Sequence, residues 1–174
     1  IGMVSEIEII RIIADKIKEW QPHKIVLDPV MISESGHNLL NPDASRALIQ
    51  KLMPLATLVT PNLFEAGAIL DQKLETVEDM KNAAVRIYKK GISNVLIKGG
   101  HLRGEAVDIF YDGSDFKEYS ASRIDSKNTH GTGCTYSSAI TSFIAQGKEL
   151  DQAVNEAKEY ITGAIANAAD IGKG

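Results

Sequence analysis

Cysteine, tryptophan and long hydrophobic runs are scarce in this chain. Its 174 residues include one Cys, one Trp and four His. A single thiol cannot form an internal disulfide, and one Cys with four scattered His provides no zinc-ligand spacing. No apolar run approaches the roughly 18 to 20 residues that span a bilayer, and no secretory signal pattern is visible. We therefore expect a cytoplasmic protein with no zinc site and no membrane span.

The chain also has no long run of charged residues of one sign. The 19 Lys and Arg residues are interspersed with 23 Asp and Glu residues, which gives a formal net charge of −4. Without a basic stripe or a polybasic patch, neither nucleic acid nor a membrane surface is an expected partner. The Walker pattern GxxxxGK[ST] is absent too, so a bound nucleotide would not lie in a P-loop. A small-molecule ligand and one domain over residues 1–174 are predicted.

Short apolar runs alternate with amphipathic helical patterns along the chain. This alternation predicts an α/β fold with a mainly parallel sheet that helices cover on both faces. Ser5, Asn62 and Thr76 with Asp79 are the expected helix caps. Helices are predicted at 5–19, 43–52, 62–70, 76–91, 133–146 and 150–169, strands at 24–28 and within 56–62 and 93–101, and a hairpin from 105–113 to 116–122.

Four polar loops follow the predicted strands or open a helix: LDPVM (27–31), VTPNLFEA (59–66), IKGGH (97–101) and SKNTHGTGC (126–134). Functional groups gather at the carboxyl ends of parallel strands, where loops are free to carry chemistry. We therefore expect these loops to form one crevice.

The last of these loops has the features of an anion site. Gly131 and Gly133 permit a tight turn with exposed backbone N–H groups, and the apolar run that follows begins a helix whose positive end faces that turn. Cys134, the only thiol, lies at this helix N-terminus, where a thiolate is favoured as a base or nucleophile. The alternative is a small buried thiol without chemistry.

The IKGGH loop could hold phosphate in a second way. Lys98 at a strand end would place its ammonium on a phosphate group, and Gly99 and Gly100 would let a nucleotide approach the backbone. The alternative is a turn lysine in solvent.

Oxygen donors come from the other two loops. Asp28, Asn62 and Glu65 form a sparse set that suits Mg²⁺, which takes one or two carboxylates and completes its shell with water and substrate phosphates. The alternatives are a helix cap for Asn62 and a solvated first-turn acid for Glu65.

Taken in order, the motifs LDPVM, VTPNLFEA, VLIKGGH and NTHGTGCTYSSAI closely resemble those of the ribokinase-like vitamin kinases. Specifically, they resemble the hydroxymethylpyrimidine and phosphomethylpyrimidine kinases of thiamin synthesis. The resemblance covers essentially the whole chain and implies a three-layer α/β/α fold, with ATP and Mg²⁺ as cofactors. The chain resembles the C-terminal two-thirds of such a kinase, so the family's N-terminal part is expected to be missing.

The resemblance implies catalytic roles at the glycine-rich turn. Most ribokinase-like sugar kinases have an aspartate where this chain has Cys134, and the resemblance assigns Cys134 to activation of the substrate hydroxymethyl group. Gly131, Thr132 and Gly133 would form the anion hole for the transferring phosphoryl group. Lys98 resembles the lysine that neutralises the phosphates of ATP.

Binding roles follow at the other loops. Asn62 and Glu65 match the family's PNxxE motif for magnesium and nucleotide, and Asp28 matches the acid of its DPV loop. Met3 and Val30 resemble residues that flank the pyrimidine ring. Asn128 departs from the acid that many sugar kinases carry at that position.

Three hypotheses of function stay open at this point. The first is ATP-dependent phosphorylation of 4-amino-5-hydroxymethyl-2-methylpyrimidine and its monophosphate. The second is a pyridoxal kinase of the same cysteine-bearing branch, because both acceptors present a hydroxymethyl group on a flat heteroaromatic ring. The third is an inactive nucleotide-binding fragment. A homodimer is expected from the family's habit alone.

Overall fold

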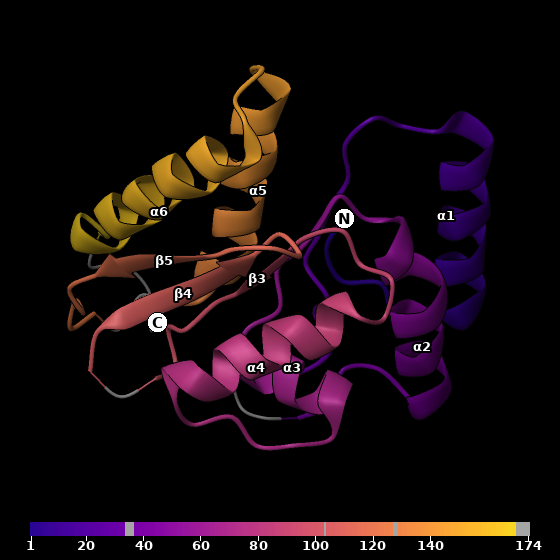
Figure 1. Ribbon diagram of the computed structural model, residues 1–174, viewed down its shortest axis with the longest axis horizontal. Coiled ribbons are helices and arrows are strands. Elements are labelled where there is room, and N and C mark those ends of the chain that lie inside the picture. Colours follow the sequence, from indigo (N-terminus) through magenta and orange to yellow (C-terminus); the bar gives the residue numbers. More distant parts are fainter. Residues whose placement is uncertain (34–36, 103, 127–128, 170–174) are drawn as a thin grey trace.

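A computed structural model describes residues 1–33, 37–102, 104–126 and 129–169 (Figure 1). One five-stranded sheet has the order β1-β2-β3-β4-β5. Neighbours β1, β2 and β3 are parallel, whereas β4 pairs antiparallel with both β3 and β5, so β4 alone runs in the opposite direction. The strands are β1 (Val26–Leu27), β2 (Leu58–Val59), β3 (Val95–Ile97), β4 (Ala106–Tyr111) and β5 (Phe116–Ala121).

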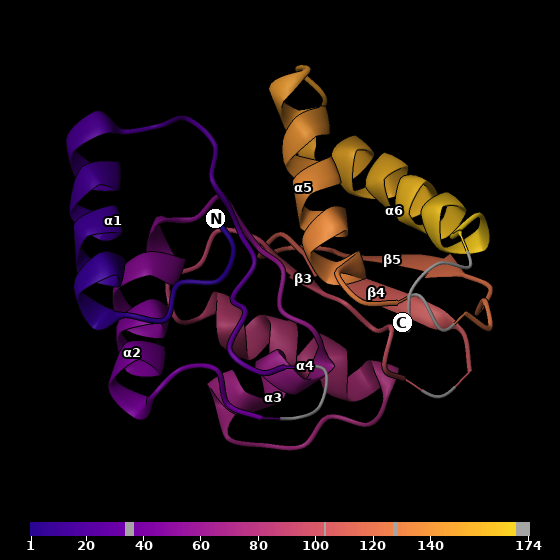
Figure 2. The ribbon, with the colours of Figure 1, turned by 180° about the vertical axis from the view of Figure 1, so that it is seen from behind.

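Helices cover both faces of this sheet, as Figures 1 and 2 show. One face carries α1 (Ile7–Trp20), α2 (Pro42–Ala47), α3 (Leu63–Leu70) and α4 (Val77–Tyr88), and the other carries α5 (Thr132–Ala145) and α6 (Leu150–Ala166). The predicted α/β/α layering and the hairpin between β4 and β5 are confirmed.

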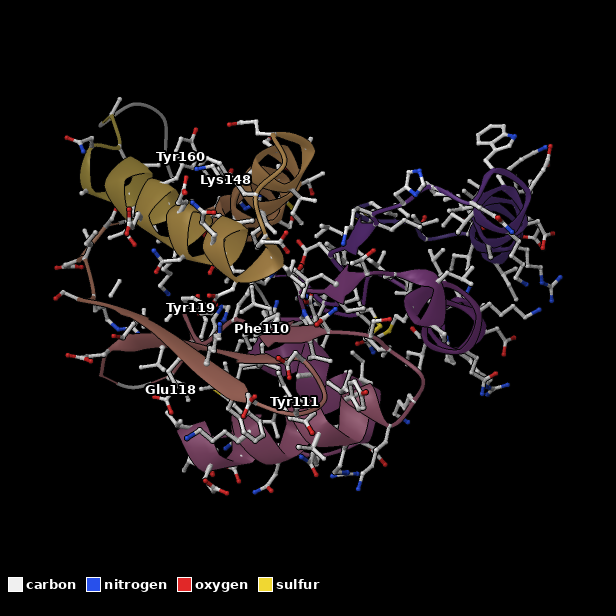
Figure 3. All side chains as sticks on the ribbon, turned by 45° about the horizontal axis from the view of Figure 1, so that its top comes forward. Phe110, Tyr111, Glu118, Tyr119, Lys148 and Tyr160 are labelled. Carbon is white, nitrogen blue, oxygen red and sulfur yellow. The ribbon has the colours of Figure 1, made fainter. Side chains whose placement is uncertain are left out.

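Side chains of the central strands alternate between two apolar cores, as the two-residue period of a strand requires. Leu27, Val59 and Val95 pack with the α1–α4 side, whereas Val26, Leu58 and Leu96 pack with α5 and α6. Figure 3 shows the same division in the hairpin: Phe110 and Tyr119 lie toward α6, and Tyr111 lies toward α4. Burial on both faces explains why these strands have the sequence pattern of continuous apolar runs.

Two of the three predicted caps are confirmed. Asn62 caps α3 and Thr76 caps α4, each in a reciprocal capping box with the acid three residues later. The Ser5 cap is wrong, because α1 begins at Ile7 with Glu6 at the cap position and without a side-chain cap bond. Ser5 therefore stands one residue too early to reach the free N–H groups of the first turn.

The structure also differs from the helix predicted at 43–52. Asn41, which the sequence pattern did not reveal as a cap, caps α2 by accepting the N–H of Ala44 at 2.8 Å. The α-helix ends at Ala47 and continues as a π-helical turn (Leu48–Leu52) and a 3₁₀ turn (Met53–Leu55). Pro54 has no N–H to donate, which gives a physical reason why the helical segment stops in this 3₁₀ turn.

A buried ion pair ties α6 to β4. The Nζ atom of Lys158 lies 2.8 Å from Oδ2 of Asp108 and 3.0 Å from the carbonyl oxygen of Ala106. Both charged side chains are buried. Oδ1 of Asp108 accepts the backbone N–H of Gly99 at 2.8 Å, so this pair also supports the loop that follows β3.

Among the described residues, none of the helices combines the length and the apolar composition needed to cross a membrane.

Replacing Lys158 by Met should destabilise the fold, because Asp108 would remain buried without its cation. The expected loss is about 3 to 5 kcal/mol in the free energy of unfolding, measured by denaturant titration. The control is Lys73→Met, which removes an exposed ion pair with Glu75 and should cost less than about 1 kcal/mol. Equal losses in the two variants would contradict the role of the Lys158–Asp108 pair.

Candidate active site

Strand register brings three polar side chains together at the carboxyl edge of the sheet. Asp28, Thr60 and Lys98 each follow directly after β1, β2 or β3. Lys98 is held by the ladder itself, because its N–H donates to the carbonyl of Pro61 at 2.9 Å and it pairs in parallel with Asn62. The predicted crevice of strand-end loops therefore has a structural basis in these three positions.

The centre of this group is a buried ion pair between Lys98 and Asp28. Their Nζ and Oδ1 atoms are 2.5 Å apart, and the residues are only 9% and 3% exposed. The hydroxyl of Thr60 donates to the same Oδ1 at 2.9 Å, and the hydroxyl of Ser137 lies 3.5 Å from Oδ2. Because Lys98 is buried and paired, the alternative of a solvated turn lysine is wrong.

The glycine-rich turn adjoins this ion pair. Gly131 takes a left-handed conformation (φ 76°) at the cap of α5, which side chains rarely adopt. A Cβ atom on Gly133 would lie only 3.3 Å from Nζ of Lys98, so the first turn of α5 and the lysine are direct neighbours. The first N–H groups of a helix have no partner within it. The N–H of Thr132 already donates to the carbonyl of Thr129 at 3.2 Å. The N–H groups of Gly133 and Cys134 remain at the open end of α5 beside the Lys98 ammonium, as an anion site requires.

Cys134 follows in the first turn of α5 and is exposed, so the alternative of a buried thiol is wrong. Its backbone carbonyl accepts the hydroxyl of Ser137 at 3.1 Å. In the described part of the chain, an open pocket of about 90 Å³ lies at Cys134, lined by Ile1, Gly2, Val26, Asp28, Cys134, Ser137, Ser138 and Thr141.

The pocket differs from the predicted substrate contacts. Neither Met3, which is 59% exposed, nor the half-buried Val30 lines it. Its apolar wall comes instead from Ile1, Gly2 and Val26. Ile1 is fixed beside β1, because its backbone nitrogen donates to the carbonyl of Val26 at 2.8 Å and its carbonyl accepts the N–H of Asp28 at 2.9 Å.

Asn62 and Glu65 are bound to one another. Oδ1 of Asn62 accepts the N–H of Glu65 at 2.9 Å, and Oε2 of Glu65 accepts the N–H of Asn62 at 2.7 Å. Asn62 is thus the N-cap of α3, which was the alternative to a role in ligand binding. Glu65 is only 2% exposed, so it is not the solvated acid of its alternative interpretation.

Burial raises the pKa of Glu65 from 4.5 to about 7. The positive charge of Lys98 and the N–H of Asn62 oppose this rise, while the negative charge of Asp28 adds to it. A desolvated carboxylate beside a second carboxylate is a place where a cation restores favourable charge balance. The described residues hold no cluster of three or more His, Cys, Asp or Glu side chains suited to a metal. Asp28 and Glu65 supply two carboxylates, a donor set of the kind that Mg²⁺ takes when phosphate and water complete its shell.

The two glycines after Lys98 differ in their surroundings. A Cβ atom on Gly99 would lie 1.8 Å from the carbonyl oxygen of Val107, so only glycine fits there. A Cβ atom on Gly100 would meet open space. Gly99 therefore has a packing reason that the sequence did not reveal, and nucleotide contact at both glycines stays a prediction. Asn128 lies outside the described residues.

Thr60 and Ser137 belong to the site although the sequence motifs did not single them out. The sequence pattern predicts only their secondary structure, with Thr60 in a strand and Ser137 within a helix, although Thr60 lies in the same strand-end position as Asp28. The shared position is the sequence signal that could have identified Thr60. Ser137 has no comparable signal, because it is separated from Asp28 by 109 residues.

Comparison with known sequences identifies close relatives. The phosphomethylpyrimidine kinase family matches residues 1–174. The chain is 46% identical over 174 residues to the thiamine biosynthesis bifunctional protein ThiED of Geobacter sulfurreducens, covering 99% of this chain and 36% of that protein. It is 42% identical over 175 residues to the hydroxymethylpyrimidine/phosphomethylpyrimidine kinase of Aquifex aeolicus, covering 100% of this chain and 69% of that protein.

Solved structures share the fold. The crystal structure of phosphomethylpyrimidine kinase from Clostridium difficile 630 matches with a TM-score of 0.83 and 48% identity, over 94% of this chain and 67% of that chain. The ADP complex of Bacillus subtilis pyridoxal kinase matches with a TM-score of 0.90 and 41% identity, over 98% and 64%. The chain thus spans from about a third to about two thirds of the length of these relatives.

The raised pKa of Glu65 predicts a specific pH dependence of stability. In the unfolded chain Glu65 ionises near pH 4.5, whereas in the folded protein it keeps its proton until about pH 7. The folded state therefore loses stability as pH rises through this window. Because glutamine cannot ionise, Glu65→Gln should gain about 3 kcal/mol relative to the parent between pH 4 and 8.

Denaturant unfolding of both proteins at several pH values measures this difference. Glu8→Gln removes an exposed carboxylate on α1 and controls for the change of net charge. Parallel pH profiles for the parent and Glu65→Gln would show that Glu65 is ionised throughout the window, which would contradict the dominant effect of burial on its pKa.

Proposed function

Because this chain belongs to the phosphomethylpyrimidine kinase family, we propose that its protein transfers the γ-phosphoryl group of ATP to the pyrimidine precursor of thiamin. The acceptors are the hydroxyl of 4-amino-5-hydroxymethyl-2-methylpyrimidine and the phosphate of its monophosphate. The observation that carries the proposal is the contact between the buried Lys98–Asp28 pair and the first turn of α5. This contact supports the proposal because the cation adjoins the first turn of a helix that also carries an exposed thiol.

In this proposal the first turn of α5 and Lys98 stabilise the transferring phosphoryl group. Gly131, Thr132 and Gly133 would form the anion hole around its oxygens, with backbone N–H groups of the two glycines as donors, since the N–H of Thr132 is bonded to the carbonyl of Thr129. The ammonium of Lys98 would neutralise phosphate charge. Phosphoryl transfer depends on positioning and charge neutralisation more than on covalent chemistry with the protein. Asp28 and Glu65 would hold Mg²⁺, which supplies further neutralisation of the phosphates when bound.

Cys134 is the proposed base in the first phosphorylation. The acceptor oxygen forms a bond to the γ-phosphorus as the bond to the β-phosphate oxygen breaks, and the hydroxyl proton passes to Sγ of Cys134. No covalent cysteine intermediate is required. The exposed position of Cys134 in the pocket wall supports this role, because the thiol is accessible to an acceptor in that pocket.

A pyridoxal kinase is the second candidate function. The similarity to Bacillus subtilis pyridoxal kinase, at 41% identity and a TM-score of 0.90, favours it as a specific alternative. Pyridoxal and the pyrimidine both carry a hydroxymethyl group on a flat six-membered ring, so the same base and phosphate site would serve either acceptor. An inactive nucleotide-binding fragment is the third hypothesis. We also propose a homodimer and a cytoplasmic location, where ATP is available.

A coupled assay of ADP release tests the acceptor. With Mg²⁺ and ATP, the complete gene product should turn over hydroxymethylpyrimidine and its monophosphate with a higher kcat/KM than pyridoxal. Turnover of pyridoxal alone would contradict the pyrimidine kinase and support the second candidate, a pyridoxal kinase. Binding of ADP without turnover of any acceptor would instead support the third.

Replacement of Cys134 by Ala tests the base. A positioned general base typically contributes about 10²- to 10⁴-fold, so kcat for hydroxymethylpyrimidine should fall by at least about 100-fold while the KM for ATP stays unchanged. Ser142→Ala, an exposed position on the same helix outside the pocket, is the control. Near-parental kcat in Cys134→Ala would remove the thiol from the mechanism.

A further inference from the structure

Arg123 makes three hydrogen bonds to the loop that begins with Lys98. It lies just after β5, and its guanidinium donates from Nε to the carbonyl of Gly104 at 2.8 Å and from Nη1 to that of Gly100 at 2.9 Å. A third bond runs from Nη2 to the carbonyl of Leu102 at 2.5 Å. The loop is residues 98–104, of which the structure describes all but residue 103.

The same loop is fixed at its start by other groups. The N–H of Gly99 donates to Asp108 at 2.8 Å, and the N–H of Leu102 closes a turn onto the carbonyl of Gly99 at 2.9 Å. The second half of the loop is held by apolar contacts of Leu102 in the core and of the His101 ring with Phe64, and Arg123 adds the hydrogen bonds to its carbonyls. A guanidinium suits this task because its planar fork presents several donors in fixed directions.

The direction of the loop carbonyls matters for an anion site. In a planar trans peptide the C=O and the following N–H point in opposite directions. Glycine peptides rotate readily, and three glycines lie in loop 98–104. When Arg123 binds the carbonyl of Gly100, the adjoining N–H, which belongs to His101, is fixed on the other side. Without that restraint, rotated carbonyl dipoles would be free to oppose a phosphate beside Lys98.

We propose that Arg123 is a positioning residue that holds loop 98–104 in the conformation that receives the phosphates of the nucleotide. Because Arg123 lies just after β5, its three bonds join the end of β5 to the loop that begins with Lys98. This inference rests on the proposed kinase function for its effect on turnover, whereas the restraint on the loop is a property of the fold.

Two readouts in Arg123→Gln test this role. Hydrogen exchange of peptides covering residues 98–105 should become faster by about tenfold, with exchange of the β1–β3 core unchanged. The Kd for ADP and the KM for ATP should each rise by about tenfold, while the KM for the acceptor is unchanged. Arg123→Lys retains the charge but not the fork, and should fall between the parent and Arg123→Gln in both readouts.

Arg46→Gln is the matched control, because Arg46 is an exposed guanidinium on α2 that pairs with Asp43. It should leave loop exchange and ADP affinity unchanged. Weaker ADP binding in Arg123→Gln with unchanged loop exchange would mean that Arg123 contacts the nucleotide directly, which overturns the positioning role. Unchanged exchange and unchanged affinity would overturn it as well.

The experiments distinguish failure of the kinase proposal from failure of this inference. A parent protein that turns over no acceptor contradicts the kinase activity, yet loop exchange and ADP affinity still decide what Arg123 does. Thermal unfolding of each variant is measured alongside, and Arg123→Lys provides the comparison if Arg123→Gln is strongly destabilised.

Discussion

The candidate site depends on the buried ion pair between Lys98 and Asp28. Removing two charges from water is costly, and their mutual attraction offsets that cost only when the geometry is good and the remaining polar atoms are bonded. Here Thr60 donates to the same carboxylate oxygen and the short strands β1 and β3 fix both backbones. Replacing such a pair by apolar side chains is often neutral for stability. Its position beside the first turn of α5 therefore points to function as the reason for the charges.

The same pair organises the electrostatics around it. Lys98 also faces Glu65, whose pKa it lowers against the larger effect of burial, while the charge of Asp28 raises it. Lys98 thus lies near two acidic side chains in a poorly solvated place. A phosphate arriving beside Lys98 would add negative charge to this group, and a divalent cation would balance it. This imbalance gives a physical account of why a nucleotide and Mg²⁺ would bind there together.

Local signals in the sequence were sufficient for much of the fold. The caps at Asn62 and Thr76 and the hairpin about Asp112 depend on residues a few positions apart, and all three are present. The sequence could not supply contacts between distant segments. Ser137 and Asp28 are 109 residues apart, and the pocket wall at Ile1 exists because that residue lies beside β1. The Ser5 cap failed for another reason, since a shift of one residue in the helix start removes the bond.

The loop after β3 shows how one short motif combines packing and chemistry. Its first two residues are tied to different ion pairs: the side chain of Lys98 to Asp28, and the N–H of Gly99 to Asp108. Asp108 is in turn neutralised by Lys158 from α6. The loop therefore links the helix layer on the α6 side with the strand ends, and its first two glycines have different surroundings. Gly99 is required by the carbonyl of Val107, whereas Gly100 faces open space. A sequence motif such as KGG consequently identifies where a site lies, but only the surroundings of each residue separate the positions that support the loop from those exposed to a ligand.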